Sequence, residues 1–475
     1  MELVLKTSGQ QCLVGSNPTP SADTNENDTT RRPGRSRVNE EISHSSRRAA
    51  KHPTVARHGR LKKSSAWRTL LKVTASVAAV LMVSGVSVAA YAAWDLADTV
   101  QPSVTLGNEE VLEGVPDVGA IDGGVNFLLV GSDSRQGQGT GFGDPTQETA
   151  VLNDVTMLLH IAEDHTHASV ISFPRDMLVD LVGCTDPETG QELWDQYDVK
   201  INTALGYGGM ACVVSTVENL TGVTIPFAGV VQFLGVAGLS EAVGGVEVCV
   251  AEPIEDLYTG VFLDAGMHTL KGIDALQFLR TRHGVGDGSD LGRISNQQVF
   301  LSALARTLQS DGTFNDPVKL FSIAKAALAN MQLSDSLTDP VRMVSIAAAM
   351  KNIDLAQLAF IQYPTGYTAN GAAVVPTSSA DIVNLALQND TPVVFDTEQA
   401  DASFASQKDE TASPSPSAEA TEEPAETTEP TETADAGSET ATASPEPTAE
   451  ALPSDVYGQT AADTRCSAGR TLADQ

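Results

Sequence analysis

Residues 125–135 read VNFLLVGSDSR, an apolar run of strand length that ends in Gly-Ser-Asp. Two more apolar runs, residues 155–161 and 168–173, follow a Gly-rich stretch and are joined by a short polar turn. This pattern predicts three strands, of which the last two form a hairpin. If the middle strand is antiparallel to both neighbours, the end of the first, the start of the second and the end of the third share one edge of a sheet. Open α/β sheets usually build their sites at such edges.

Charged side chains gather at these three strand ends: Asp133, Arg135, Asp154, Arg175 and Asp176. Farther along, apolar patterns predict helices around residues 211–222 and 234–242, a strand within 225–235, and two helices from about residues 272 and 290. The segments DPVKLFSIA (316–324) and DPVRMVSIA (339–347) echo each other. Both predict a helix start, because Asp caps a helix and Pro fits its first turn.

The chain has 475 residues and a formal net charge of −32, but this charge is unevenly spread. Residues 1–68 hold 13 Lys and Arg against 6 Asp and Glu, residues 69–395 hold 13 against 37, and residues 396–475 hold 3 against 18. A body this acidic excludes a general polyanion-binding surface, so nucleic acid is not an expected partner. One anion held by a few concentrated arginines is compatible with this charge.

An uncharged stretch of 22 residues, 73–94, separates the basic and acidic parts. As a helix it would span the hydrocarbon core of a bilayer, about 30 Å thick. Basic residues precede it, and Trp67, Tyr91 and Trp94 flank it, as the positive-inside rule and the aromatic belt predict. The alternatives are a buried core helix or a cleaved signal peptide, and the long basic region before it disfavours the latter. We therefore expect a single-pass protein of the cytoplasmic membrane, with its N-terminus inside and its body outside.

The predicted organisation has six parts. Residues 1–69 form a disordered basic cytoplasmic head, 70–94 the transmembrane helix and 95–124 an extracellular stalk. Residues 125–395 form the main domain, with a motif core at 125–308 and a helical accessory part at 309–395. Residues 396–455 form a Pro/Ser/Thr/Glu-rich disordered tether, and 456–475 a short C-terminal patch. The segment GSNPTP at 15–20 resembles a translated end of a transfer RNA gene, so the true start is expected downstream of it.

Four of the five cysteines fall in the predicted external part: Cys184, Cys212, Cys249 and Cys466. An oxidising compartment favours disulfides, and four cysteines allow three connectivities. The preferred hypothesis pairs Cys184 with Cys212 and Cys249 with Cys466. Zinc is not expected, because the chain has no CxxC or HExxH motif.

Arginine is scarce between residues 69 and 395, and five of the seven arginines there lie in the compact polar segments: Arg135, Arg175, Arg280, Arg282 and Arg293. Arginine binds phosphate in a planar, bidentate way. Arg280 and Arg282 are two positions apart, so their side chains point the same way only if the chain is extended there. Asp133 and Asp154 together suit Mg²⁺, or Mn²⁺ in its place, with substrate phosphate completing the coordination. The alternative is that each Asp and Arg forms only a structural ion pair.

Several other signals are weaker. The Gly-rich loops 137–143 and 284–288 lack the GK[ST] ending of a P-loop, and Ser132 and Ser134 lie in no GxSxG elbow. His283 beside the arginine pair is a candidate proton carrier, although a turn or core role is the commoner one. These features do not change the phosphate-binding hypothesis.

Five segments in order resemble the motifs of the LytR-CpsA-Psr family, in the type found in actinobacteria: GSDSR (131–135), NDVTML (153–158), SFPRD (172–176), KIN (200–202) and LRTRHGVGDGSDLGRISNQQ (279–298). The resemblance covers about residues 125–308. It implies an α/β fold, with a central mixed β-sheet sandwiched by α-helices and an apolar pocket for a polyprenyl chain. It also implies an enzyme that moves a glycopolymer from a polyprenyl-pyrophosphate carrier to peptidoglycan through a phosphodiester.

The resemblance also implies roles for single residues. Asp133 and Asp154 would bind Mg²⁺, and Arg175, Arg280 and Arg282 would hold the pyrophosphate. The remaining substrate-binding positions would be Arg135, Lys200, Asn202, Asp290, Arg293 and Gln297, and the general base would be Asp133, Asp176 or Asp290. One departure is Leu152, where the family pattern usually has Arg, so Arg135 is a candidate substitute. A polyprenyl-pyrophosphate phosphatase and a non-catalytic envelope regulator, or attenuator, are the alternative functions.

Overall fold

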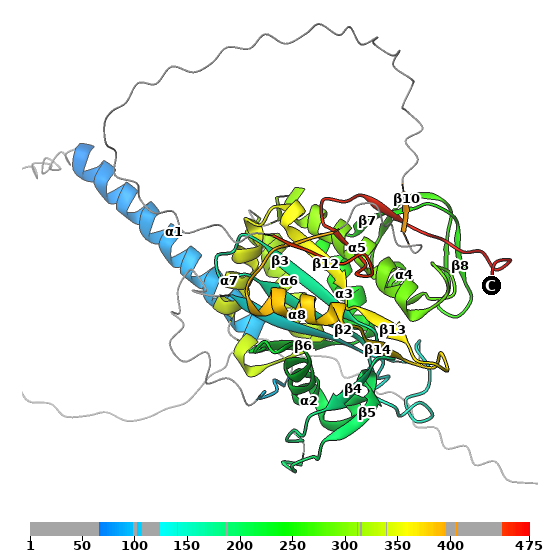
Figure 1. The fold of residues 1–475 in the computed structure, drawn as a ribbon. Helices are drawn as coiled ribbons and strands as arrows, with labels where there is room; N and C mark the ends of the chain where they lie inside the picture. Colours follow the sequence, from blue (N-terminus) through cyan, green and yellow to red (C-terminus); the bar gives the residue numbers. More distant parts are fainter. Residues whose placement is uncertain are drawn as a thin grey trace, which may run out of the picture. The chain divides into compact units, whose positions relative to one another are not determined.

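The computed structural model describes residues 66–97, 102–106, 124–139, 141–186, 189–310, 312–313, 316–338, 340–395, 404–406 and 449–475. The expected head up to residue 65, the start-site hypothesis, and most of the expected stalk and tether lie outside these residues. Helix α1 (Ala66–Ala97) is drawn as one unbroken helix in Figure 1. Its residues Ala66–Val88 are long and apolar enough to cross a bilayer, judged by length and composition.

A seven-stranded mixed sheet forms the centre of the body, in the order β11-β6-β1-β2-β3-β12-β18. In that order, its strands are Met331–Leu333, Phe227–Val231, Val125–Ser132, Asn153–Ile161, Ala168–Phe173, Leu358–Gln362 and Gly458–Thr460. Strand β2 pairs antiparallel with both β1 and β3, which confirms the predicted hairpin. Because Ser132 faces Asn153 and Thr156 faces Phe173, the three predicted strand ends do meet at one edge.

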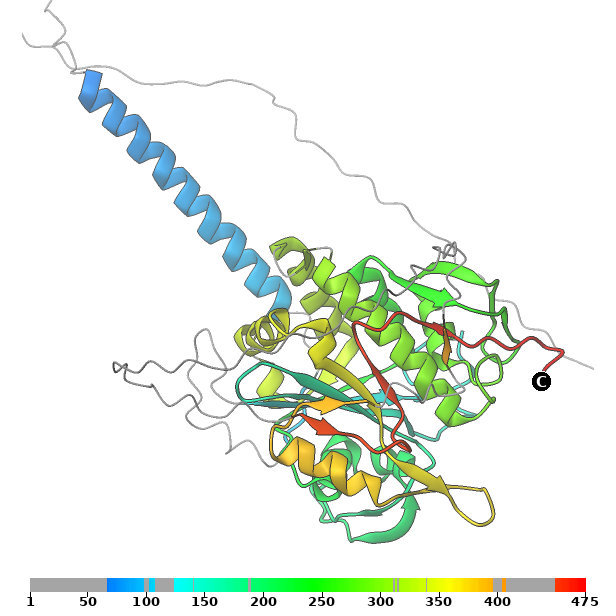
Figure 2. The same cartoon turned by 45° about the horizontal axis from the view of Figure 1, so that its top comes forward.

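Helices cover both faces of this sheet, as Figures 1 and 2 show. Helices α2 (Ala204–Thr221) and α8 (Ser379–Gln388) pack on one face. Helices α3 (Phe233–Val243), α5 (Asp290–Ser310), α6 (Pro317–Asn330) and α7 (Pro340–Lys351) supply residues to the cluster on the other face. The expected sandwich of a mixed sheet between helices is confirmed.

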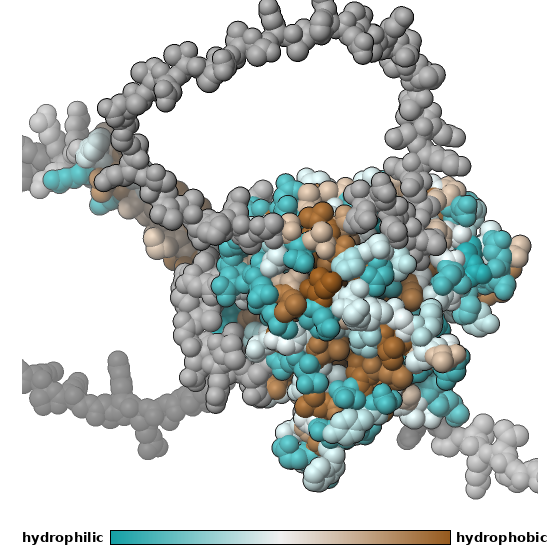
Figure 3. Space-filling view, viewed as in Figure 1, coloured by the Kyte–Doolittle hydropathy of each residue, from teal (hydrophilic) through white to brown (hydrophobic). Residues whose placement is uncertain are grey.

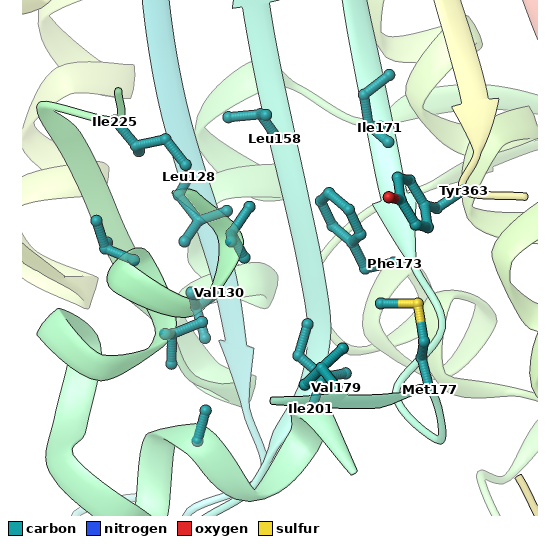
Figure 4. Packing of buried hydrophobic residues seen from close by; sticks show 14 of the residues in the cluster. Leu128, Val130, Leu158, Ile171, Phe173, Met177, Val179, Ile201, Ile225 and Tyr363 are labelled. Carbon is teal, nitrogen blue, oxygen red and sulfur yellow. The ribbon is translucent and has the colours of Figure 1, made fainter. Parts of the chain in front are cut away.

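The alternation of side chains along β1 explains these two cores. Leu128 and Val130 enter the cluster under α2 and α8, whereas Phe127 and Leu129 pack in the opposite cluster. The outer surface in Figure 3 is a mosaic of hydrophilic residues and brown apolar patches. Below that surface, Figure 4 shows Leu128, Leu158 and Ile171 projecting from three neighbouring strands into the first core.

A second, smaller sheet has the order β10-β7-β19-β16. Its strands are Gly266–Leu270, Val246–Val250, Arg465–Ser467 and Phe404–Ser406, and helix α4 (Ile273–Arg280) belongs to the same core cluster. Short pairings complete the body: β4 (Leu178–Leu181) with β5 (Gln196–Lys200), β8 (Ile254–Asp256) with β9 (Val261–Leu263), β13 (Thr365–Tyr367) with β14 (Val374–Pro376), and β15 (Val393–Val394) with β17 (Glu450–Ala451). Within the described residues, 3-10 turns lie at Ile201–Thr203, Asp335–Leu337 and Leu355–Gln357.

The C-terminal residues are part of the body. Strand β18 forms an edge of the central sheet and β19 joins the second sheet, so the segment expected as a separate patch contributes to both. The structure joins Cys249 to Cys466 and Cys184 to Cys212, with Cα atoms 4.5 and 5.3 Å apart. The first of these disulfides links β7 to β19.

Helix starts follow the sequence signals in part. Asp316 caps α6 through the amides of Val318 and Lys319, and α7 begins at Pro340, as the repeated DPV segments predict. Helix α2 begins at Ala204, earlier than predicted, because it continues across a kink at Gly208 and Gly209. The Gly209 φ of 72° is tolerated because glycine has no Cβ.

Candidate functional site

A cavity of ≈ 370 Å³ lies between the central sheet and helices α3, α4 and α5. Its walls are mostly apolar: Leu129, Val155, Met157, Val231, Phe233, Val236, Leu239, Val243, Leu276, Leu279, Phe300, Leu301 and Leu304. Its polar residues are concentrated in the motifs and include Asp154, Arg175, Arg280, Arg282, Arg293 and Gln297. An apolar space therefore meets a cluster of cationic groups. Within this cluster we call the pair Arg280 and Arg282 the arginine mouth.

Arg175 is the centre of an ion-pair network at the sheet edge. Its Nη1 lies 2.7 Å from Asp154 Oδ1, and its Nε lies 3.5 Å from Asp176 and 3.7 Å from Asp290. Burial lowers the pKa of Arg175, but the hydrogen bond and charge of Asp154, with the other two carboxylates, outweigh this and raise it. Arg175 is therefore charged and its charge is largely compensated by protein carboxylates.

The first turn of helix α5 ties this network to the sheet. Asp290 accepts from the Arg175 amide at 3.2 Å, and its other oxygen lies 2.7 Å from Arg293 Nη2. Arg293 is 5% exposed and also donates to the carbonyl oxygen of Asp154 at 2.6 Å. The side chains that begin α5 thus hold the ends of β2 and β3 together.

Asp133 lies apart from these ion pairs. Its Oδ1 accepts from the Leu152 amide at 2.7 Å, and its own amide donates to the Leu152 carbonyl at 3.1 Å. Burial raises the pKa of Asp133; the Leu152 hydrogen bond opposes this, and the nearby Asp154 charge adds to it. Two carboxylates that repel each other beside a cluster of arginines are a donor set that fits a hard divalent cation.

Arg280 and Arg282 form no ion pair among the residues that the structure describes. Burial lowers the pKa of both, with positive neighbours adding to this: Arg135 for Arg280 and Arg175 for Arg282. The guanidinium of Arg280 lies over the Phe233 ring, 4.1 Å from its centroid. Half-buried arginines without a carboxylate partner mark a site that attracts an anion.

The backbone explains how two arginines so close in sequence reach one site. Arg280 is the last residue of helix α4, and Thr281 has extended angles of φ −62° and ψ 138°. The chain is therefore extended at Thr281, whereas Arg280 is still helical. Gln297, expected to assist the substrate, lines the cavity and donates to the Leu279 carbonyl at 3.0 Å, so it also supports the end of α4.

The other predicted residues lie around this centre. Lys200 Nζ lies 2.6 Å from Asp176 Oδ1. The backbone N–H of Asn202 donates to the Arg175 carbonyl at 3.3 Å. The buried side-chain oxygen of Asn202 has no hydrogen-bond partner in the described part of the chain. Arg135 pairs with Glu148 and lies 5.9 Å from the Phe233 ring. Arg135 therefore lies near Arg280, whose pKa its charge helps to lower, but it has Glu148 as a partner.

The three candidate general bases differ in their environment. Asp176 and Asp290 are both engaged in ion pairs, with Lys200 and Arg293 respectively. Asp133 is outside every ion pair found between described residues, and its pKa is raised. His283 stacks on Tyr258 with ring centroids 4.5 Å apart, beside the cavity.

Some residues at the site have no sequence signal of their own. Phe233 begins α3 and contacts the arginine mouth, and Gln138 accepts from the Leu234 amide at 2.8 Å, which places the Gly-rich loop against the same helix start. Asp256 and Thr281 form a buried pair beside the arginines. The only sequence signal for Phe233 is its position next to the short apolar helix predicted at 234–242, and this pattern is too common to indicate a functional residue.

The family model of the LytR-CpsA-Psr family matches residues 94–389, which contain the sheet edge, the cavity and the arginine mouth. The chain belongs to the LytR-CpsA-Psr family. All five motifs of this LytR-CpsA-Psr protein lie within the matched residues, and the described side chains from them converge on one site.

Two similar proteins have names that refer to cell-wall biosynthesis. The cell wall biosynthesis protein LcpA of Corynebacterium glutamicum is 31% identical over 246 residues, 47% of this chain and 47% of LcpA. The polyisoprenyl-teichoic acid–peptidoglycan teichoic acid transferase TagT of Bacillus subtilis is 27% identical over 331 residues, 67% of this chain and 92% of TagT. Among solved structures, a LytR-Csp2A-Psr enzyme from Actinomyces oris is 20% identical, with a TM-score of 0.43 over 58% of this chain and 91% of its own. The chain spans about half the length of LcpA and its paralogue LcpB.

Proposed function

We propose that this LytR-CpsA-Psr protein is a membrane-anchored phosphotransferase of cell-envelope assembly. It would move a glycopolymer from a polyprenyl-pyrophosphate carrier to peptidoglycan and leave a phosphodiester link. The observation that carries this proposal is the meeting of an apolar cavity with Arg280 and Arg282, which have no carboxylate partner in the described structure. A lipid pyrophosphate has the matching two halves, an apolar chain and a compact polyanion.

The arrangement of charges supports the assignment of roles. The positive charge of Arg175 is compensated by Asp154, Asp176 and Asp290, so Arg175 would mainly stabilise the sheet edge. It would also contact the phosphates from the cavity side. Arg280 and Arg282 supply net positive charge, which the bound pyrophosphate would neutralise. Arg135 would contribute from the Gly-rich loop, in place of the arginine usual at position 152.

Asp133 and Asp154 would hold Mg²⁺. No group of three or more His, Cys, Asp or Glu in the described residues is arranged to hold a metal alone, so phosphate oxygens would complete the coordination. When bound, the cation would offset negative charge on the pyrophosphate. Its presence would also relieve the repulsion that contributes to the raised pKa of Asp133.

In the proposed reaction, a sugar hydroxyl of the acceptor attacks the glycan-side phosphorus. A new P–O bond forms, the P–O bond to the bridging oxygen breaks, the hydroxyl proton passes to a base, and polyprenyl phosphate leaves. The arginines would stabilise the negative charge that builds on the leaving phosphate. Positioning and charge stabilisation account for most of the rate enhancement in phosphoryl transfer.

Helix α1 would anchor the protein, and by the positive-inside rule the basic residues that precede it favour an N-terminus in the cytoplasm and a body outside. The carrier lipid would then lie in the same membrane as the anchor. Disulfides in the body suit this external location.

The test uses the full chain in nanodiscs, a polyprenyl-pyrophosphate-linked glycan and peptidoglycan fragments. We expect Mg²⁺-dependent glycan attachment that is lost in Asp133→Ala and retained in Lys271→Ala, a change at an exposed residue outside the site. Phosphate release at the same rate without acceptor would favour the phosphatase alternative. Neither attachment nor phosphate release from a bound carrier would favour the regulatory alternative.

A further inference from the structure

Asp256 is a buried carboxylate that forms no ion pair with a described Lys or Arg, although His283 lies near enough to help lower its pKa. It ends strand β8, is 0% exposed and belongs to none of the five motif segments. Its Oδ2 accepts from the Thr281 hydroxyl at 2.6 Å, and its Oδ1 accepts from the Tyr258 amide at 2.8 Å. Burial raises its pKa, but these hydrogen bonds outweigh the effect and hold the pKa below the ordinary value. A buried ionised carboxylate is costly unless hydrogen bonds compensate it, so its position invites a functional explanation.

Thr281 lies between the two arginines that define the arginine mouth. It is 0% exposed, and its hydroxyl donates to Asp256 while it accepts from the Gly284 amide at 3.3 Å. Its own amide still completes helix α4 by donating to the Gln277 carbonyl at 3.1 Å. Helix α4 thus ends at Thr281, and the Thr281 hydroxyl links this end both to Asp256 and to the following loop at Gly284.

Neither Arg280 nor Arg282 has an ion pair with a described residue that would fix its guanidinium group. Arg280 has the Phe233 ring as a neighbour, and Arg282 has no ion pair among the described residues. Their backbone is held instead: Asn296 donates to the Phe278 carbonyl at 2.7 Å, Gln297 to the Leu279 carbonyl, and Asp256 holds Thr281. The directions of both guanidinium groups therefore depend on the backbone at Thr281.

We propose that Asp256 and Thr281 are a positioning pair, which sets the direction of Arg280 and Arg282 so that both face one pyrophosphate. This inference rests on the proposed function and deepens it. Asp256 borders the cavity, but its two carboxylate oxygens are engaged by the Thr281 hydroxyl and the Tyr258 amide, so it would act through Thr281. A hydroxyl is needed at 281, since only a group that donates and accepts at once joins the carboxylate to the following loop. A small displacement of catalytic groups costs large factors in rate and binding.

Thr281→Val tests the pair with little change in volume, and Thr281→Ser is its matched control because it keeps the hydroxyl. The probe is geranyl pyrophosphate with Mg²⁺, bound to the full chain in nanodiscs, with geraniol as a probe for the cavity alone. We expect Thr281→Val to weaken geranyl pyrophosphate binding at least tenfold and Thr281→Ser to stay within twofold of the wild type. Geraniol affinity should be unchanged in both.

Asp256→Asn provides a second variant, since its oxygen still accepts from the Tyr258 amide while the charge is lost. We expect an affinity for geranyl pyrophosphate between the wild-type and Thr281→Val values. Wild-type affinity in Thr281→Val, or equal losses for geraniol and geranyl pyrophosphate, would overturn the positioning role. If Thr281→Val does not fold, the same comparison in Asp256→Asn decides. Failure of the wild type to bind geranyl pyrophosphate would instead contradict the proposed function.

Discussion

The guanidinium of Arg175 donates to the Asp154 carboxylate across the adjacent strands β3 and β2, with Nη1 and Oδ1 2.7 Å apart. The same guanidinium lies within 4 Å of Asp176 and Asp290. Arg175 therefore has protein partners, whereas Arg280 and Arg282 have no ion pair in the described residues. This difference separates arginines that hold the site together from arginines available to a ligand.

Arg280→Ala or Arg282→Ala should abolish glycopolymer attachment, with a loss of at least 100-fold, and leave the fold intact. No described ion pair is lost, so the free energy of unfolding should change by less than about 1 kcal/mol in Arg282→Ala. In Arg280→Ala it should fall by about 1–2 kcal/mol, because the contact with the Phe233 ring is also lost. Attachment assays and urea unfolding would measure the two effects. Arg306→Ala is the contrast: it removes hydrogen bonds to the carbonyls of Ala461 and Asp463 and should cost about 1–3 kcal/mol of stability without reducing donor affinity. Normal attachment in either mouth variant would refute the assignment.

Asp133→Asn should stabilise the protein at neutral pH. The folded-state pKa of Asp133 is raised above 3.8, so its ionisation opposes folding. The gain should therefore be absent below pH 3.8, grow as pH rises through the folded-state pKa, and persist at neutral pH. Thermal unfolding across this pH range would measure it.

Mg²⁺ with geranyl pyrophosphate should raise the melting temperature of the wild type more than that of Asp133→Asn. The reason is that the metal would remove the repulsion between the two carboxylates only where both are present. An equal shift in the two proteins would place the metal elsewhere.

Leu239→Trp should shorten the cavity, because Leu239 lines it from helix α3. We expect weaker binding of long polyprenyl pyrophosphates by about tenfold, equivalent to about 1.4 kcal/mol, and little change for geranyl pyrophosphate. Competition binding with a series of chain lengths would show this. Equal loss at every length would mean that the tail does not enter this cavity.

Leu152→Arg should restore the cation usual in the family. Its backbone makes two hydrogen bonds with Asp133, so the new side chain would start beside the site. We expect geranyl pyrophosphate affinity to rise severalfold in Leu152→Arg and to fall in Arg135→Ala. If affinity falls in Arg135→Ala but is restored in the double variant, the two positions supply the same contact.

Gly469→Ala should destabilise the body through its C-terminal segment. A Cβ at Gly469 would lie 1.8 Å from the Glu252 carbonyl oxygen, and backbone atoms cannot yield as a side chain does. Overpacking of this kind costs about 1–3 kcal/mol, which urea unfolding would detect. Gly141→Ala is the control, because nothing lies within 4 Å of its Cβ. Equal stability of both variants would show that the segment is not tightly packed.

The sequence by itself determined the elements whose signals are local. Apolar runs of strand length in VNFLLV and in residues 155–161 and 168–173 predicted β1, β2 and β3, and Asp316 with Pro317 predicted the start of α6. Because these strands are consecutive and antiparallel, their order also placed Asp133, Asp154 and Arg175 at one edge. Side-chain periodicity and helix capping depend on a few neighbouring residues, so they are visible without the fold.

Only the tertiary structure decided which distant segments meet. It seats Arg280 and Arg282 at an apolar cavity built from α3, α5 and the sheet, assigns Gln297 to the end of α4, and brings Cys466 to Cys249 across 217 residues. It also pairs Asp256 with Thr281, which no spacing in the chain indicates. The physical reason is that such contacts arise from burial of non-local surfaces, and many chain positions present the same local pattern while only one packing satisfies every buried group.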